Sequence, residues 1–89
     1  MTVPVNHDYP HPGVLRPVSG SNQPIEGAEV RIFTLVNYLA GDYETPYAET
    51  TTDADGNWVD TVDLPDAMSW AVHFQKLEEM APTHVEITT

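Results

Sequence analysis

A short segment rich in turn-forming residues lies between two β-prone stretches near the middle of the chain. The segment is Asp53-Ala-Asp-Gly-Asn57, in which Gly56 can adopt a positive φ angle without steric cost. The β-branched residues Thr50–Thr52 precede it and favour an extended backbone. Beyond it, apolar residues recur on one parity: Trp58, Val62 and Leu64. The sequence therefore predicts a β-hairpin over residues 47–64.

Alternation of apolar and polar residues predicts further strands on both sides of this hairpin. The clearest alternation places Ala28, Val30 and Ile32 inward and Glu29 and Arg31 outward. The predicted strands are residues 13–18, 28–35, 69–75 and 84–88. We expect the first of them at a sheet edge, because Pro17 cannot donate to a ladder.

Two segments between the predicted strands lack a clear period. Residues 36–46 contain Gly41-Asp42 and end at Pro46, so we expect a long loop or an irregular hairpin tip. Residues 76–82 are expected to form a loop with at most one helical turn. Six or seven short strands without a convincing helix predict an all-β fold, a small antiparallel Greek-key β-sandwich.

The N-terminal residues 1–12 are expected to form an extended arm, separate from a sandwich domain at residues 13–89. Prolines at positions 4, 10 and 12 favour polyproline-like extension. The few apolar side chains of this arm are too sparse to fold alone, and we expect them to contact another subunit: Val3, Val5 and Tyr9.

Several pieces of this pattern resemble a known family. Pro24-Ile-Glu-Gly-Ala-Glu-Val30 and Thr51-Thr-Asp-Ala-Asp-Gly-Asn-Trp58 look like the two most specific motifs of the carboxypeptidase regulatory-like domain. The resemblance covers roughly residues 13–88 and implies a transthyretin-like (prealbumin-like) β-sandwich. It also implies an accessory, non-catalytic role. The segment from Leu35 to Tyr47 looks long for that family, and residues 1–12 have no counterpart in it.

The negative net charge of the chain limits the classes of partner that it can be expected to bind. Three basic residues face fourteen acidic ones in 89 residues, and the net charge is −11. Phosphate backbones are repelled by such a chain, so we expect no nucleic-acid partner. No apolar run approaches the roughly 20 residues of a membrane span, so we expect no membrane partner. The chain has no cysteine, and Met1 without a secretory leader indicates a complete, stand-alone chain.

Two segments carry possible metal ligands. Asp53-Ala-Asp-Gly56 resembles the start of a calcium loop, but the twelfth position is Leu64 where that loop needs a bidentate Glu. The segment containing His7, Asp8 and His11 offers imidazole and carboxylate ligands without a closed set. We therefore predict no metal and no cofactor.

The sequence shows no nucleophile–base set, so the chain is not expected to be an enzyme. Its three serines lie outside any nucleophile elbow, and glycine-rich phosphate loops are absent. The long loop instead carries three tyrosines among small polar residues, a composition typical of binding surfaces. We expect a protein or glycan contact there or, equally, rings that cap the end of the sandwich: Tyr38, Tyr43 and Tyr47.

Two functional hypotheses follow from these observations. The first is a non-enzymatic structural subunit of a phage-like virion, such as a decoration, spike or connector protein, that forms a homo-oligomer and binds protein partners. The second is a carbohydrate- or surface-binding accessory module of an exported assembly. The parity of Trp58 and Trp70, which points both rings inward, weakens the second hypothesis. Either one places the chain in a virion or an extracellular assembly.

Overall fold

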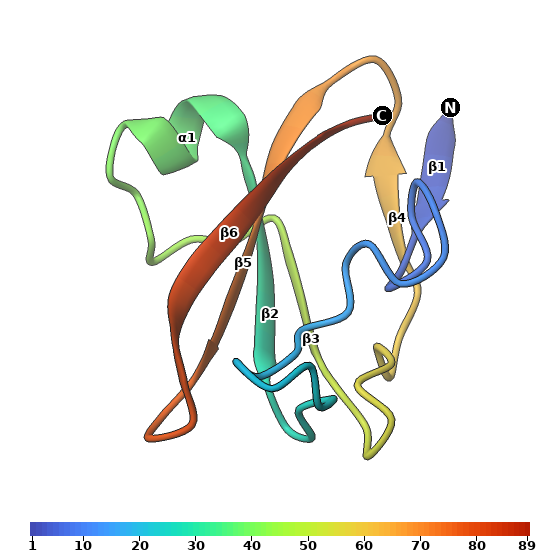
Figure 1. Cartoon of the computed structure of the whole chain (residues 1–89). Coiled ribbons are helices and arrows are strands. Elements are labelled where there is room, and N and C mark those ends of the chain that lie inside the picture. The colour runs from blue at the N-terminus through green and yellow to red at the C-terminus, as the bar shows by residue number, and fades with distance from the viewer.

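The computed structural model describes residues 1–89 and contains two antiparallel sheets and one short helix (Figure 1). The elements are β1 (Thr2–Val5), β2 (Glu29–Thr34), α1 (Leu35–Leu39), β3 (Ala48–Thr51), β4 (Val62–Pro65), β5 (Ser69–Lys76) and β6 (Met80–Thr88). One sheet has the order β3-β2-β5-β6, and the other pairs β1 with β4. The prediction of a small, mostly antiparallel β domain is confirmed.

A single hydrophobic core lies between the two sheets. Alternate residues of β2 and β5 point into it, as the sequence alternation predicted, and the other sheet contributes one buried residue from each strand. The principal core residues are Val30, Ile32, Trp70, Val72, Phe74, Val5 and Leu64. Side chains of the opposite parity in β2 and β5 face the outer side of the four-stranded sheet, where α1 lies (Figure 1).

The predicted hairpin forms at its turn but not along its second strand. The Asp53 amide donates to the Asn57 carbonyl (2.9 Å), and Thr52 forms an antiparallel bridge with Trp58. The indole Nε1–H of Trp58 donates to the Leu15 carbonyl across the core (2.8 Å). The Val59 amide still donates to the Thr51 carbonyl (2.9 Å), but from Val62 the chain belongs to the other sheet, where β4 pairs with β1 instead of β3.

The prediction that residues 1–12 form a separate arm is wrong. β1 pairs with β4 over four residue pairs, and Val5 is completely buried in the common core. Pro4 is tolerated because this small sheet has a free edge on each strand. The His7 ring accepts a hydrogen bond at Nδ1 from the Trp58 amide (3.1 Å). Residues 1–12 thus pack against their own domain.

The predicted first strand at residues 13–18 is also wrong. Gly13 has a φ of 77°, and the Arg16 amide donates to the Gly13 carbonyl in a turn. Only Val18 keeps an extended pairing, an isolated bridge to Pro24 around the predicted loop. Leu15 is nevertheless completely buried, so this segment packs against the core without regular secondary structure.

The two segments predicted as loops both contain regular structure. Thr34 caps α1, its hydroxyl accepting from the Asn37 amide (3.3 Å), and Gly41 follows the helix with a φ of 88°. The β5–β6 connection is a tight turn in which Glu78 has a positive φ, so β6 begins already at Met80. Capping and turn hydrogen bonds therefore form a short helix and a tight turn, whereas residues 40–47 connect α1 to β3 as a loop, as expected.

The two motifs that carry the family resemblance meet in space. The Thr52 hydroxyl accepts from the Ala28 amide (2.9 Å) and donates to the Ile25 carbonyl (2.6 Å). Gly56, at a φ of 74°, lies against Pro24, where an added Cβ would be 3.0 Å from the proline side chain. Each motif therefore completes the backbone hydrogen bonding and packing of the other.

Candidate functional site

The outer face of the four-stranded sheet carries an aromatic cluster beneath α1. Phe33 points outward from β2, yet it is only 1% exposed. Tyr38 covers it from α1 (5.6 Å between ring centroids), and Tyr43 covers it edge-on from the following loop (6.5 Å). Tyr38 and Tyr43 also contact each other at 5.0 Å in a T-shaped arrangement.

A pair of histidines extends this cluster across β5 and β6. His73 and His84 are directly opposite each other in the ladder. The Thr89 amide donates to the Met68 carbonyl, so these two residues form a hydrogen-bonded pair at the end of the same ladder. Because hydrogen-bonded and non-hydrogen-bonded pairs alternate along an antiparallel ladder, His73 and His84 form a non-hydrogen-bonded pair, the type in which the side chains lie closer together. The Tyr38 ring lies 5.9 Å from the His73 ring and 4.8 Å from the His84 ring.

A chain of hydrogen bonds orients these rings. The Gln75 amide nitrogen donates to Glu29 (2.9 Å), which leaves the Gln75 Oε1 as the acceptor for His73 Nε2–H (3.1 Å). With Nε2 as the donor, His73 Nδ1 accepts from the Tyr38 hydroxyl (3.0 Å). The Tyr38 ring on α1 is thereby tied to a carboxylate on β2.

The pKa of the Tyr38 phenol is raised above its ordinary value of 10.0. Burial against the cluster is the larger cause, and the neighbouring Tyr43 hydroxyl adds to it. Tyr38 therefore stays neutral and acts as a hydrogen-bond donor at physiological pH. A phenolate nucleophile or metal ligand would need a pKa shifted the other way.

The loop that presents Tyr43 is held by Asp42. This carboxylate accepts from the Thr45 hydroxyl (2.6 Å) and from the amides of Glu44 (3.2 Å) and Thr45 (3.3 Å). The Thr45 hydroxyl bond is the largest cause of a lowered Asp42 pKa, followed by the Glu44 amide. The ionised carboxylate thus fixes the turn that places Tyr43 over Phe33.

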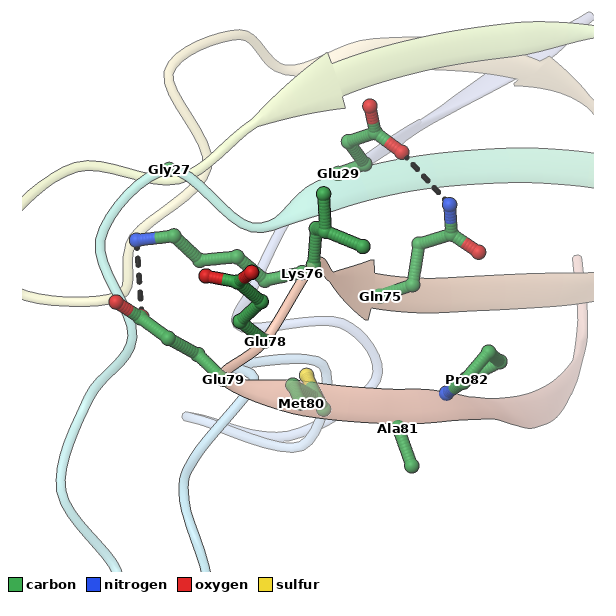
Figure 2. A pocket seen from close by; sticks show the side chains of 10 residues that line it. Gly27, Glu29, Gln75, Lys76, Glu78, Glu79, Met80, Ala81 and Pro82 are labelled. Carbon is green, nitrogen blue, oxygen red and sulfur yellow. Dashed lines mark hydrogen bonds and ion pairs between the residues drawn. The ribbon is translucent and has the colours of Figure 1, made fainter.

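Two adjoining hollows open on this outer face. The aromatic hollow, of about 380 Å³, is lined by Arg31, Phe33, Tyr38, Tyr43, His73, Gln75 and Pro82. The turn hollow, of about 930 Å³, lies at the β5–β6 turn and shares Gln75 and Pro82 with the first. Figure 2 shows its lining, with Gln75 and Glu29 on the strands and Glu78 and Glu79 near the turn. Two basic side chains offset these carboxylates: Lys76 pairs with Glu79 at 3.0 Å, and Arg31 pairs with Glu29 at 3.5 Å.

The tyrosines predicted as interaction residues divide between two places. Tyr38 and Tyr43 lie in the aromatic hollow, and Tyr43 keeps 53% of its surface exposed. Tyr47 is also exposed but packs against Trp70 (5.0 Å) and does not line the hollow.

The predicted contact residues of the N-terminal segment serve the fold of their own chain. Val5 is buried, and Val3 and Tyr9 pack against the same core. The Tyr9 hydroxyl donates to the Thr88 carbonyl at the end of β6 (2.8 Å). These contacts within the subunit correct the expectation that the three side chains are free to insert into a neighbour.

Several residues of the hollow were not predicted from the sequence, namely Phe33, Arg31, His73, Gln75 and Pro82. One signal was present: alternation along β2 places Phe33 on the polar, outward parity. A large aromatic residue on a polar face requires a cover, and the following tyrosines are the nearest candidates. The histidine pair depends on the β5–β6 register, which no local pattern reveals.

The two segments considered as metal ligands have other partners in the structure. Asp53 Oδ1 accepts from the amides of Asp55 (2.9 Å) and Asn57 (3.0 Å), which closes the central turn. Asp8 Oδ1 accepts from the Gly13 amide (2.9 Å). No group of three or more candidate ligands gathers in a geometry suited to a metal ion.

Comparison of the chain with protein-family models, with curated proteins and with solved structures finds no match. The one helix, α1, spans five residues, and no helix is long and apolar enough to cross a membrane.

Proposed function

We propose that this chain is a non-enzymatic interaction module, a small structural subunit of a phage-like virion such as a decoration, spike or connector protein. The observation that carries this proposal is the aromatic hollow. There, Tyr43 presents a half-exposed ring whose orientation is already fixed by Phe33, Tyr38 and Asp42. Rigid aromatic anchors beside an open hollow are typical of protein contact sites, because little side-chain entropy is lost on binding.

The polar groups at the hollow support a binding role over a catalytic one. The hydrogen-bond chain from Tyr38 through His73 to Gln75 ends on Glu29, and each member holds the next in position. The raised pKa of Tyr38 keeps this phenol protonated, as its role of hydrogen-bond donor to His73 requires.

The many carboxylates of the chain favour a partner whose contacting segment is basic or neutral. Residues 42–66 carry eight carboxylates and no basic side chain. The turn hollow adds Glu29, Glu78 and Glu79 beside the aromatic hollow. A segment that places an apolar or aromatic side chain in the aromatic hollow and a lysine or arginine toward the turn fits this distribution of charge.

The finer fold assignment is part of the same proposal. We infer a Greek-key sandwich of the carboxypeptidase regulatory-like type, supported by the contact of the two motifs through Thr52. Accessory modules of this type fit a chain that works within an exported or virion assembly. The fold by itself does not establish that role.

The test uses the products of genes that neighbour this one, beginning with capsid, portal and tail proteins. Each purified product is titrated into the isotope-labelled chain and followed by NMR. We expect shifted resonances around Arg31, Tyr38, Tyr43 and His73. Tyr43→Ala should weaken binding at least about tenfold, whereas Val59→Ala, at an exposed apolar position outside both hollows, should not. Binding that is insensitive to Tyr43→Ala contradicts the proposal.

A carbohydrate- or surface-binding module is the second candidate, and one feature favours it. Tyr43 lies beside Arg31 and Gln75, whose polar groups suit the hydroxyls of a sugar stacked on the ring. Against it, Trp58 and Trp70 are both buried and offer no stacking surface. Binding to a glycan panel that is lost in Tyr43→Ala, together with no binding to the neighbouring gene products, would replace the first candidate with this one.

A further inference from the structure

The longest strand of the molecule lies at a sheet edge that no other strand covers. β6 spans nine residues at the end of the order β3-β2-β5-β6, so only one of its sides is paired (Figure 1). Exposed edges are usually protected by charged side chains, because unpaired N–H and C=O groups can recruit another strand. In a chain of net charge −11, β6 carries Glu86 as its only carboxylate. Such an edge is suited to pairing.

The ladder to β5 determines which backbone groups of β6 are free. The Thr89 amide donates to the Met68 carbonyl, and antiparallel pairs alternate between bonded and non-bonded. In the observed register, Thr83, Val85 and Ile87 therefore bond to β5. The even-numbered residues direct their backbone groups away from the sheet: Pro82, His84, Glu86 and Thr88.

Two of these outward groups are not available. Pro82 has no N–H, and the Thr88 carbonyl already accepts from the Tyr9 hydroxyl (2.8 Å). The free donors are therefore the amides of His84, Glu86 and Thr88. The free acceptors are the carbonyls of Pro82, His84 and Glu86. Donors and acceptors are equal in number.

We propose that two copies of the chain pair through their β6 strands, antiparallel about a two-fold axis at Val85, and join their four-stranded sheets into one. In this register His84 of each copy is opposite Glu86 of the other, so both residues exchange N–H and C=O bonds. The Thr88 amide donates to the Pro82 carbonyl of the second copy. Pro82, which has no N–H, then faces the Thr88 carbonyl that already accepts from Tyr9, and every free group from Pro82 to Thr88 is satisfied.

The two neighbouring registers satisfy fewer backbone N–H and C=O groups, and they place identical side chains opposite each other. An axis at His84 places the two His84 rings opposite each other and leaves the Glu86 carbonyl without a donor, because Pro82 is opposite. An axis at Glu86 opposes two carboxylates and directs the His84 amide at the occupied Thr88 carbonyl. The Val85 axis instead places an imidazole opposite a carboxylate twice on the outer face. This self-complementarity identifies the occupant as a second copy of the chain.

The charge of the chain determines how the dimer should respond to salt. Two chains of net charge −11 repel each other, while the proposed interface is mostly backbone hydrogen bonds. Salt screens the long-range repulsion more than it weakens those bonds. Self-association should therefore strengthen with ionic strength. The inference does not depend on what occupies the aromatic hollow, and Tyr43→Ala should leave the dimer unchanged.

The first test is sedimentation equilibrium of the full chain, in which we expect a monomer–dimer equilibrium that tightens up to about 0.5 M salt. His84→Pro removes an outward N–H that makes no bond to β5, so it should weaken dimerisation at least about tenfold. His84→Thr is the matched control, since it removes the ring but keeps the N–H, and it should retain most of the affinity. Thermal melting of each variant verifies that it remains folded.

A charge exchange tests the register itself. In the Val85 register, His84→Glu places a carboxylate opposite Glu86 of the other copy at two symmetric positions, which should weaken the dimer. Adding Glu86→Lys replaces each repulsive pair by a pair of opposite charges and should restore the dimer. With an axis at His84 the introduced carboxylates would face each other in both variants, and no rescue would occur. A chain that remains monomeric up to about 1 mM, or a folded His84→Pro chain that dimerises like the parent, overturns the proposal. The same holds if β6 pairs only with a strand of another protein.

Discussion

The inner and outer faces of the four-stranded sheet are stabilised by different interactions. Inward residues such as Val72 and Trp70 are wholly buried and depend on apolar area removed from water. On the outer face, His73 and Gln75 are half-buried and depend on hydrogen bonds that pass from strand to strand. The inner face therefore supplies most of the stability. The outer face supplies defined positions for exposed rings, which is what a binding surface needs.

Removing the cover of the inner face should have the largest effect. Deletion of residues 1–12 takes away β1 and the buried Val5, and it exposes Leu64 and the edge of β4. We expect loss of cooperative unfolding, measured by near-ultraviolet circular dichroism during thermal melting. Deletion of the fully exposed Met1 alone is the control. A truncated chain that melts like the parent would mean that the N-terminal contacts contribute nothing.

A cavity within the inner face should have the next largest effect. Trp70 is completely buried, and its indole nitrogen donates to the Thr89 hydroxyl (3.1 Å). Trp70→Ala should lower the free energy of unfolding by ~3–5 kcal/mol, measured by urea denaturation. Trp70→Phe keeps much of the volume and should cost clearly less. Equal losses for the two variants would show that cavity volume is not the cause.

The same contrast explains which parts of the structure were predictable. Residues 28–32 alternate strictly, and residues 69–75 alternate apart from Ala71, so burial of the inward parity follows from the sequence alone. The central turn also follows, because Gly56 and the flanking aspartates are specific for it. Both predictions depend on neighbours within a few positions of one another.

The predictions that failed depend on contacts between distant residues. Nothing near Val5 reveals that Val62 is its ladder partner, and the prolines around it favoured an arm. Tyr38 and Tyr43 were identified as candidates by composition. The hydrogen-bond partner of Tyr38, His73, comes from a strand 35 positions away along the chain. Register between such strands is set by the whole core, so local sequence cannot specify it.

On the outer face, loss of one hydrogen bond should have a smaller effect. Tyr38→Phe removes the hydroxyl that donates to His73 Nδ1 but keeps the ring packing. We expect a loss of about 0.5–1.5 kcal/mol in the free energy of unfolding. The His73 ring signals in NMR should shift as well. Tyr43→Phe is the matched control, because no hydrogen bond of that hydroxyl forms part of the chain to Glu29, and it should be neutral. A neutral Tyr38→Phe would show that packing alone holds α1.

The smallest effect should come from protonating the carboxylate that holds the Tyr43 loop. The Asp42 pKa is lowered in the folded protein, chiefly by the Thr45 hydroxyl and then by the Glu44 amide. A lowered folded pKa means that the stabilisation is fully present above the ordinary value of 3.8 and is lost as the pH falls through the folded pKa. The Tyr43 ring signals, followed by NMR from about pH 5 to about pH 2, should therefore shift with a midpoint below 3.8.

Asp42→Asn should abolish that transition while leaving the melting temperature at neutral pH almost unchanged, because the loop lies outside the core. Thr45→Val, which removes the strongest donor, should raise the midpoint toward 3.8. A midpoint at or above 3.8 in the parent chain would show that the Asp42 hydrogen bonds do not orient Tyr43. The aromatic hollow would then be held from α1 alone.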